Sequence, residues 1–181
     1  MMIGPLLTYS LAVPYIAGFI QLLLNRRASG RAHAVLSSLS LLVPALASVI
    51  AFALYGPYSS YELPVYTLGY FMIFVDGLNW PVVAGIALVT VLIAVYSYPY
   101  MKERFQELGS EDWGIYYFLY VYFSASLLGI VLSNNFILFY LFLEVSLITS
   151  FLLIALYGYG NRQRISIIYL IWTHLGGFLF L

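Results

Sequence analysis

The sequence predicts an all-α fold, a polytopic membrane helix bundle with about six transmembrane helices and the N-terminus outside. The composition, 64% hydrophobic and 8% charged residues, is typical of membrane proteins and leaves too little polar surface to cover a soluble core. The apolar residues form runs of roughly 17–23, the length that a helix needs to cross a bilayer. Helices are required because the bilayer offers no water to unpaired backbone groups.

Six apolar runs are the expected transmembrane helices, and together they form one transmembrane domain over residues 1–181. Their approximate bounds are residues 3–24, 34–55, 78–98, 115–132, 135–157 and 165–181. The first run is expected to remain as a span, because no basic start of a cleavable signal peptide precedes it. Pro14 and Pro44 lie inside the first two runs and can kink those helices.

Asparagine and aspartate residues mark the starts of two helices. Asp76 or Asn79 can cap the third helix, since short polar side chains accept hydrogen bonds from the first free amides. Asn134 or Asn135 can cap the fifth helix in the same way. The link between the fourth and fifth helices is very short, which predicts that these two helices are antiparallel neighbours.

Two longer connections carry their own predictions. Residues 56–77 alternate aromatic and aliphatic side chains, which favours a hairpin lying on the membrane face. Residues 101–113 are charged and are expected to form a solvated connector. The alternative is a short helix on the membrane surface, because Met101, Phe105 and Leu108 recur at helical spacing.

The cationic side chains predict the orientation of the bundle. All seven fall in the connections after the first, third and fifth runs, and the connections after the second and fourth runs contain none. Because positively charged loops stay in the cytoplasm, this bias puts the N-terminus and Leu181 outside. The seven residues are Arg26, Arg27, Arg31, Lys102, Arg104, Arg162 and Arg164.

Glu144 is the most informative residue, because it is the one ionisable acid or base in the run from Asn135 to Tyr157. At about 1.5 Å per residue it lies ~14 Å from one end of that run and ~20 Å from the other, near the middle of the bilayer. A carboxylate at that depth costs at least about 2.5 kcal/mol, so it usually faces protein and serves function. The pattern favours proton or ion handling, and a protonated structural carboxyl is the alternative. Since the runs contain no Lys or Arg, a cationic partner for Glu144 is expected from another chain.

His174 is the second candidate site residue. It lies ~15 Å into the sixth run from the cytoplasmic side, a depth similar to that of Glu144. Histidine titrates near physiological pH and suits a proton relay, but a lone histidine on a helix is often a hydrogen-bonded packing residue. Both interpretations stay open from the sequence.

Small and hydroxyl-bearing residues are expected to mediate close helix packing. Ser146, Thr149 and Ser150 share one face of the fifth run, and Gly176 and Gly177 lie in the sixth. A water-supporting role for the hydroxyls is the alternative.

Several function classes are excluded or unsupported. The absence of cysteine excludes disulfides, Cys-ligated zinc and iron–sulfur clusters. The net charge of zero argues against nucleic-acid binding. No phosphate-binding glycine loop, metal-ligand cluster or nucleophile–base set is present, so we expect no cofactor, no bound metal and no redox site in this chain.

Three segments together resemble a known family. They are "FVDGLNWP" from Phe74, "LGIVLSNNFILFYLFLEVSLITSFLLIALYGY" from Leu128 and "YLIWTHLGGFLFL" from Tyr169. They resemble the N-terminal half of the antiporter-like subunits of complex I-type NADH dehydrogenases, membrane-bound hydrogenases and multisubunit Na+/H+ antiporters. The resemblance covers residues 70–181 well and the first two helices by topology alone.

The resemblance implies a role for Glu144 and a set of partners. In the family the helix-five glutamate is a key proton-channel residue, and it matches Glu144; His174 has no counterpart in the family motif. The usual partner is a lysine on helix seven, and this chain holds less than half of a full member. The implied partners are therefore other membrane subunits, one of which supplies the later helices and an intramembrane lysine.

The predicted function is that of a proton- or sodium-translocating, antiporter-like subunit in the cell membrane. It would be the N-terminal half, split or truncated, of a redox-driven ion pump or multisubunit cation/proton antiporter, with the redox chemistry in other subunits. The alternatives are a non-conducting structural or assembly subunit of such a complex, and an unrelated small transporter.

Overall fold

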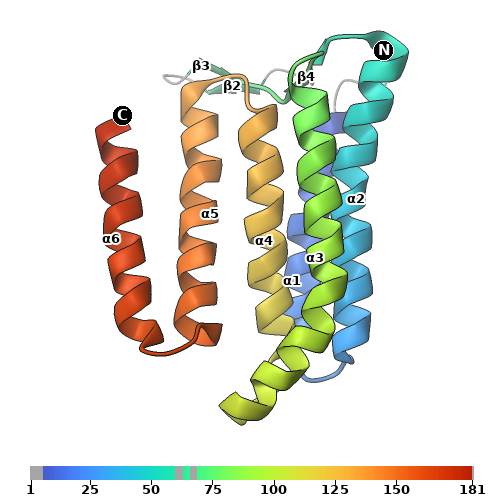
Figure 1. The fold of residues 1–181 in the computed structure, drawn as a ribbon. Helices are drawn as coiled ribbons and strands as arrows, with labels where there is room; N and C mark the ends of the chain where they lie inside the picture. The colour runs from blue at the N-terminus through green and yellow to red at the C-terminus, as the bar shows by residue number, and fades with distance from the viewer. Residues whose placement is uncertain (1–5, 60–62, 66–68, 181) are drawn as a thin grey trace.

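The computed structural model describes residues 6–59, 63–65 and 69–180 and confirms the all-α membrane bundle (Figure 1). In these residues six helices follow one another, with four short strands between the second and the third. The helices are α1 (Leu6–Leu23), α2 (Gly30–Tyr55), α3 (Asn79–Leu108), α4 (Trp113–Leu132), α5 (Phe136–Tyr157) and α6 (Arg162–Phe180).

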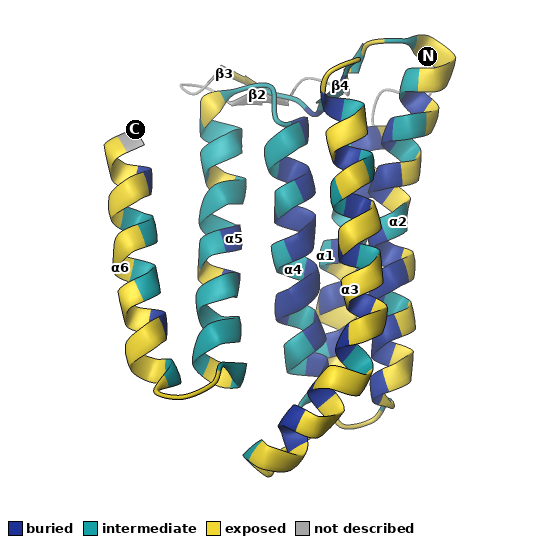
Figure 2. Cartoon of the chain, viewed as in Figure 1, coloured by how far each residue is buried: buried dark blue, intermediate teal, exposed yellow. Residues whose placement is uncertain are grey.

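The helices form two groups. Helices α1 to α4 pack together into a bundle, whereas α5 lies against α4 and α6 lies against α5, so that these three stand in a row (Figure 1). The buried side chains concentrate in the first group, and the outward surface of α6 is mostly exposed (Figure 2). We call α1–α4 the bundle and α5–α6 the outer pair.

Helices α1 to α5 are long and apolar enough to cross a membrane, judged over the described residues. The predicted sixth span does form a helix but does not meet this standard. Arg162, Gln163, Arg164 and His174 are the polar residues that reduce the apolar character of α6. The six-helix bundle is therefore confirmed, while a membrane-crossing α6 stays a prediction.

The predicted hairpin between α2 and α3 is confirmed in the described parts of residues 56–77. Strand β1 (Tyr58–Ser59) pairs antiparallel with β4 (Phe74–Val75), and β2 (Leu63–Val65) pairs antiparallel with β3 (Gly69–Phe71). The strands cover the end of the molecule at which α4 connects to α5 (Figure 1). The α2–α3 connection therefore contacts the α4–α5 connection at this end of the molecule.

The connection between α4 and α5 is bonded to the strand region. Asn135 caps α5 by accepting a hydrogen bond from the Leu138 amide (2.8 Å), as one of the two predicted caps. Its side-chain amide donates to the Tyr70 carbonyl (2.8 Å). The neighbouring Asn134 accepts from the Met72 amide (3.0 Å). The two asparagines therefore fix the N-terminal end of α5 to the hairpin.

The start of α3 follows the prediction closely. Asp76 accepts hydrogen bonds from the amides of Leu78 (2.9 Å) and Asn79 (2.8 Å), and Asn79 accepts in return from the Asp76 amide (2.8 Å). Asn79 also donates to the Phe74 carbonyl (3.0 Å), which ties the cap to β4. This reciprocal pair satisfies amides that a helix start leaves free.

The solvated connector that we expected over residues 101–113 is wrong for its first half. Helix α3 continues to Leu108, so the apolar positions Met101 and Phe105 are buried and not on a free surface helix. Helices α2 and α6 also begin before their apolar runs, at Gly30 and Arg162. Cationic residues that we placed in connections, such as Arg104, therefore lie inside helix ends.

The orientation of the bundle in the membrane stays a prediction. All the cation-bearing ends lie opposite the strand region, as alternating helices require (Figure 1). Which end faces the cytoplasm follows from the charge bias alone. Since the chain has no cysteine, single cysteines at Ser29 and Ser59 test it by labelling from opposite sides.

Candidate functional site

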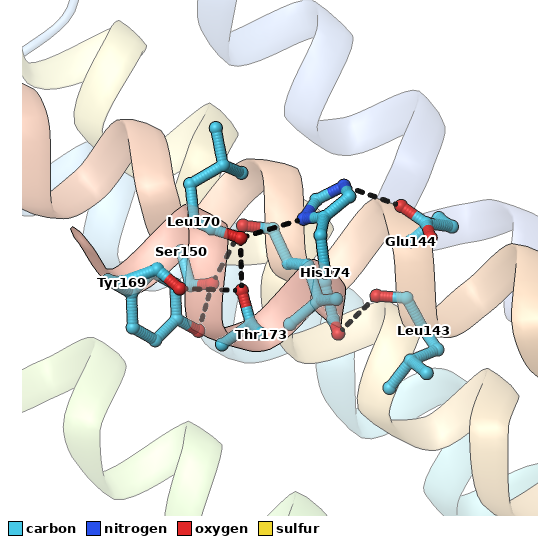
Figure 3. A network of polar contacts seen from close by, with 9 residues as sticks. Leu143, Glu144, Ser150, Tyr169, Leu170, Thr173 and His174 are labelled. Atoms are coloured by element: carbon cyan, nitrogen blue, oxygen red, sulfur yellow. Dashed lines mark hydrogen bonds and ion pairs between the residues drawn. The ribbon is translucent and has the colours of Figure 1, made fainter. Parts of the chain in front are cut away.

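The structure brings the two predicted site residues together between α5 and α6 (Figure 3). Glu144 lies in the middle of α5 and His174 in the second half of α6. The distance from His174 Nε2 to Glu144 Oε2 is 3.2 Å, within reach of a hydrogen bond or ion pair. The similar depth of these residues was predicted, but their direct contact was not.

The contact follows from the path of the chain. The link after Tyr157 is short and includes Gly160, whose φ of +63° is in the left-handed region that glycine adopts most easily. Helix α6 therefore returns antiparallel beside α5. Positions equally far from the link then face each other, which places residue 174 opposite residue 144.

The second nitrogen of His174 determines which protons the site holds. Its Nδ1 lies 3.1 Å from the Leu170 carbonyl oxygen, which can only accept a hydrogen bond. Nδ1 therefore carries a hydrogen, and in the neutral ring Nε2 is an acceptor. A neutral His174 facing an ionised Glu144 would place two acceptors against each other. The contact thus requires one further proton, either on the carboxyl group or on Nε2.

The site has further polar neighbours toward the cationic end of the outer pair (Figure 3). Thr173 donates to the same Leu170 carbonyl that His174 contacts (3.1 Å) and to the Tyr169 carbonyl (2.8 Å). The Tyr169 hydroxyl lies 2.8 Å from Ser150 Oγ on α5. We call the line from Glu144 and His174 to Ser150 and Tyr169 the polar seam.

The predicted packing residues are only partly confirmed. Ser146 and Thr149 are buried and their hydroxyls bond to backbone carbonyls of α5, as packing residues do. A Cβ atom added at Gly177 would lie 3.8 Å from the Tyr140 ring, so Gly177 is at a close contact between α5 and α6. At Gly176 no atom of this chain lies within 4 Å of the Cβ position, so close packing at this residue stays a prediction.

The lysine that we expected from another chain beside Glu144 stays a prediction. Within this chain, His174 contacts Glu144 and forms a salt bridge with it when the imidazole is protonated. The other ion pairs in the described residues, Arg26–Asp112 and Arg104–Glu107, lie near the cationic end. The side chains of Glu144 and His174 remain 23% and 42% exposed, so the site opens sideways from the outer pair.

Arg104 is a structural residue that the sequence interpretation missed. Its guanidinium is almost buried and donates to the carbonyl oxygens of Tyr157 (3.1 Å) and Gly158 at the end of α5. It also pairs with Glu107 and lies 4.1 Å from the ring centroid of Tyr159. A cation is favourable where a helix leaves its last carbonyls unpaired. Arg104 therefore attaches the C-terminal end of α5 to α3.

The described residues contain no group of three or more His, Asp or Glu side chains that could hold a metal ion. The site is instead an acid–imidazole pair at mid-helix depth, with the Tyr140 hydroxyl group beside the Glu144 carboxyl group. The fold and this pair define a polytopic membrane protein with an intramembrane ionisable site.

Comparisons with known proteins agree with the resemblance seen in the sequence. The chain is 36% identical over 112 residues to the A1 subunit of a Na(+)/H(+) antiporter of Staphylococcus epidermidis, covering 59% of this chain and 13% of that protein. It is 37% identical over 86 residues to a putative antiporter subunit, mnhA2, of Staphylococcus aureus, covering 48% and 10%. It is 26% identical over 106 residues to the M subunit of the F(420)H(2) dehydrogenase of Methanosarcina mazei, covering 58% and 21%.

The fold has a counterpart among solved structures. A chain of the membrane-bound sulfane sulfur reductase, an archaeal respiratory membrane complex, superposes with a TM-score of 0.73 at 20% identity. The match covers 96% of this chain and 26% of the other. No family model matches the chain. The relatives fit the complex I-type antiporter-like family. The chain is a multi-pass membrane protein that is similar to these subunits and spans about a fifth or less of their length.

Proposed function

We propose that the chain takes part in proton or sodium translocation as a subunit of a complex I-type redox pump or a multisubunit cation/proton antiporter. The Glu144–His174 pair is the residue set that holds and releases the proton. The single observation that supports this most is the 3.2 Å contact between two ionisable groups at mid-helix depth.

The proton count of the pair gives it two states. With the shared proton present, the pair has no net charge, whether the proton lies on the carboxyl or on the imidazole. Without that proton, the pair is an anion and its two facing atoms are both acceptors, so the contact must open. A charge in the bilayer is much less favourable than a neutral pair. The anionic state therefore needs a nearby cation, whereas the neutral state does not.

The polar seam provides groups for proton movement toward the cationic end. Thr173, Ser150 and Tyr169 carry hydroxyls that both donate and accept hydrogen bonds. They lie along the α5–α6 contact on the side of His174 that leads to Arg162 (Figure 3). A proton leaving His174 in that direction therefore meets hydroxyl groups and not hydrocarbon alone.

A partner membrane subunit completes the proposed site. The relatives are named as subunits of antiporters and of a dehydrogenase, and the exposed face of α6 leaves room for further helices. A lysine from such a helix next to Glu144 would stabilise the pair after it has lost its proton. The N-terminal-half interpretation and the supply of this lysine by another polypeptide are parts of the same proposal.

The test is the substitution Glu144→Gln, which keeps the shape and removes the titrating proton. Vesicles with the wild-type or the variant complex are compared for proton and sodium uptake at matched protein levels. We expect uptake to fall strongly while assembly stays intact. Glu103→Gln, an exposed change on the extension of α3, is the matched control and should leave uptake unchanged. Equal uptake by the Glu144 variant would refute the role.

The second candidate function is a structural or assembly subunit that does not conduct. The observation that favours it is that the Glu144–His174 contact also joins α5 to α6, as a neutral hydrogen-bonded pair would. This function would be supported if Glu144→Gln lost both assembly and uptake. It would also require that uptake returns whenever assembly is restored.

A further inference from the structure

A groove between α2 and α3 lies near the cationic end of the bundle, away from the candidate site. It encloses about 360 Å³. The small buried residues Ala34 and Ser38 lie beneath it, and the exposed side chains of Val35, Leu39 and Val95 form its apolar walls. Along α2 the groove extends from Arg31 to Leu39, which corresponds to a length of ~12 Å along the helix axis.

The mouth of the groove carries an arginine. Arg31, the second residue of α2, lines the groove together with Tyr98, and its guanidinium carbon lies 5.5 Å from the centroid of the Tyr98 ring. Lys102 follows Tyr98 by one helical turn and lies on the same face of α3. Two cations on facing helices thus flank one end of an apolar groove.

Arg31 differs from Arg26, Arg104 and Arg162, whereas Arg27 and Arg164 resemble it in having no ion pair among the described residues. Arg26 lies 3.7 Å from Asp112, Arg104 pairs with Glu107, and Arg162 donates to the Leu156 carbonyl. For Arg31 the described residues provide an aromatic ring but no carboxylate within ion-pairing distance. Its fork of N–H donors is therefore free to bind an anion from outside the protein.

We propose that this groove is a binding site for one anionic phospholipid. The phosphate lies against Arg31, with Lys102 nearby, and one acyl chain runs between Val35, Leu39 and Val95. Guanidinium groups bind phosphate oxygens through parallel hydrogen bonds, and basic pockets between helices at the membrane surface attract anionic head groups. The apolar walls favour a lipid over a free phosphate ion, because a lipid has an acyl chain that can fill the groove and a phosphate ion does not.

The test is native mass spectrometry of the full chain in detergent, with any subunits that accompany it. An equal mixture of phosphatidylglycerol and phosphatidylcholine with the same acyl chains is the probe. We expect wild type to retain phosphatidylglycerol about fivefold more than phosphatidylcholine, the effect of one basic residue near the surface. Arg31→Gln should abolish this preference. Arg27→Gln, a cation outside the groove, should keep it.

Two further measurements separate the parts of the proposal. Val35→Trp, which fills the groove, should lower retention of both lipids, whereas Ile50→Trp on the exposed outer half of α2 should not. Excess inorganic phosphate should leave lipid retention unchanged. Equal retention of both lipids by wild type, an unchanged preference in Arg31→Gln, or displacement by phosphate would each overturn the proposal.

Discussion

The bundle and the outer pair differ in the kind of polar side chains they contain and in how these side chains are bonded. In the bundle, many buried hydroxyls donate to nearby backbone carbonyls, as Ser37 and Ser48 do to His33 and Pro44, although Ser124 Oγ forms no such bond within the described residues. Among the described residues, the buried side chains of the bundle include no carboxylate. In the outer pair, by contrast, a carboxyl and an imidazole face each other at a partly exposed surface. A fixed region thus supports a region that can change its charge.

Close backbone contacts make the bundle rigid, and one matched substitution tests this. A Cβ at Gly114 would stand 2.3 Å from the Gln21 carbonyl oxygen and 2.5 Å from Asn25 Cα, both backbone atoms. We expect Gly114→Ala to lower the free energy of unfolding by about 1–3 kcal/mol, as overpacking does. Gly85→Ala, where nothing lies within 4 Å, should be neutral or slightly stabilising. Thermal unfolding in detergent measures both, and equal stabilities would contradict a tightly packed bundle.

Arg104 joins the two regions, so its loss should loosen the outer pair selectively. Arg104→Met removes the bonds to Tyr157 and Gly158 and leaves those carbonyls without their charged donor. We expect the free energy of unfolding to fall by about 1.5–3 kcal/mol, and hydrogen exchange to be faster at the C-terminal end of α5 than in α4. Lys102→Met, an exposed change on the same helix, is the control. If hydrogen exchange in Arg104→Met were equally fast in the bundle and in the outer pair, Arg104 would not be what holds α5 in place.

The outer pair should tolerate changes that the bundle would not. His174 is half-exposed, so His174→Ala should leave the fold nearly intact and reduce ion uptake less than Glu144→Gln does. Leu175→Ala on the exposed neighbouring position is the control for lost side-chain volume. Uptake into vesicles at matched protein levels measures the effect. A loss equal to that of Glu144→Gln would show that the two residues act as one unit.

The smallest expected effect concerns the hydrogen bond between Ser150 and Tyr169 in the polar seam. Interhelical hydrogen bonds in membranes contribute on average ~0.6 kcal/mol. A double-mutant cycle with Ser150→Ala and Tyr169→Phe should return a coupling of that size. A coupling of zero would remove this contact from the forces that hold α6 against α5.

The sequence predicts the bundle well because its signals are local. Apolar runs, capping residues and the alternation in residues 56–77 each act within one element, and Asn135, Asp76 and the hairpin appear where expected. The predicted helix ends were less accurate, because charged ends such as that of α3 continue as helix when tertiary contacts bury them. Arg104 shows why: its partners are more than fifty residues later in the chain.

The candidate site was predictable as two residues but not as a pair. Depth in the membrane placed Glu144 and His174 at the same level, yet depth does not specify which faces of two helices meet. That depends on the rotation of α6 about its axis, which the link at Gly160 and the contact with α5 determine. The role of Leu170 follows from backbone geometry and left no signal in the sequence.

The attachment of α5 at both ends has a consequence for how the protein is made. The hairpin partners of Asn134 and Asn135 precede them by more than sixty residues, and the Arg104 bonds form only after Gly158 has been synthesised. During synthesis, the hairpin must therefore be in place before it can hold the N-terminal end of α5, on whichever side of the membrane the hairpin lies. The helix that carries Glu144 is thus held first at its N-terminal end by the hairpin and then at its C-terminal end by Arg104.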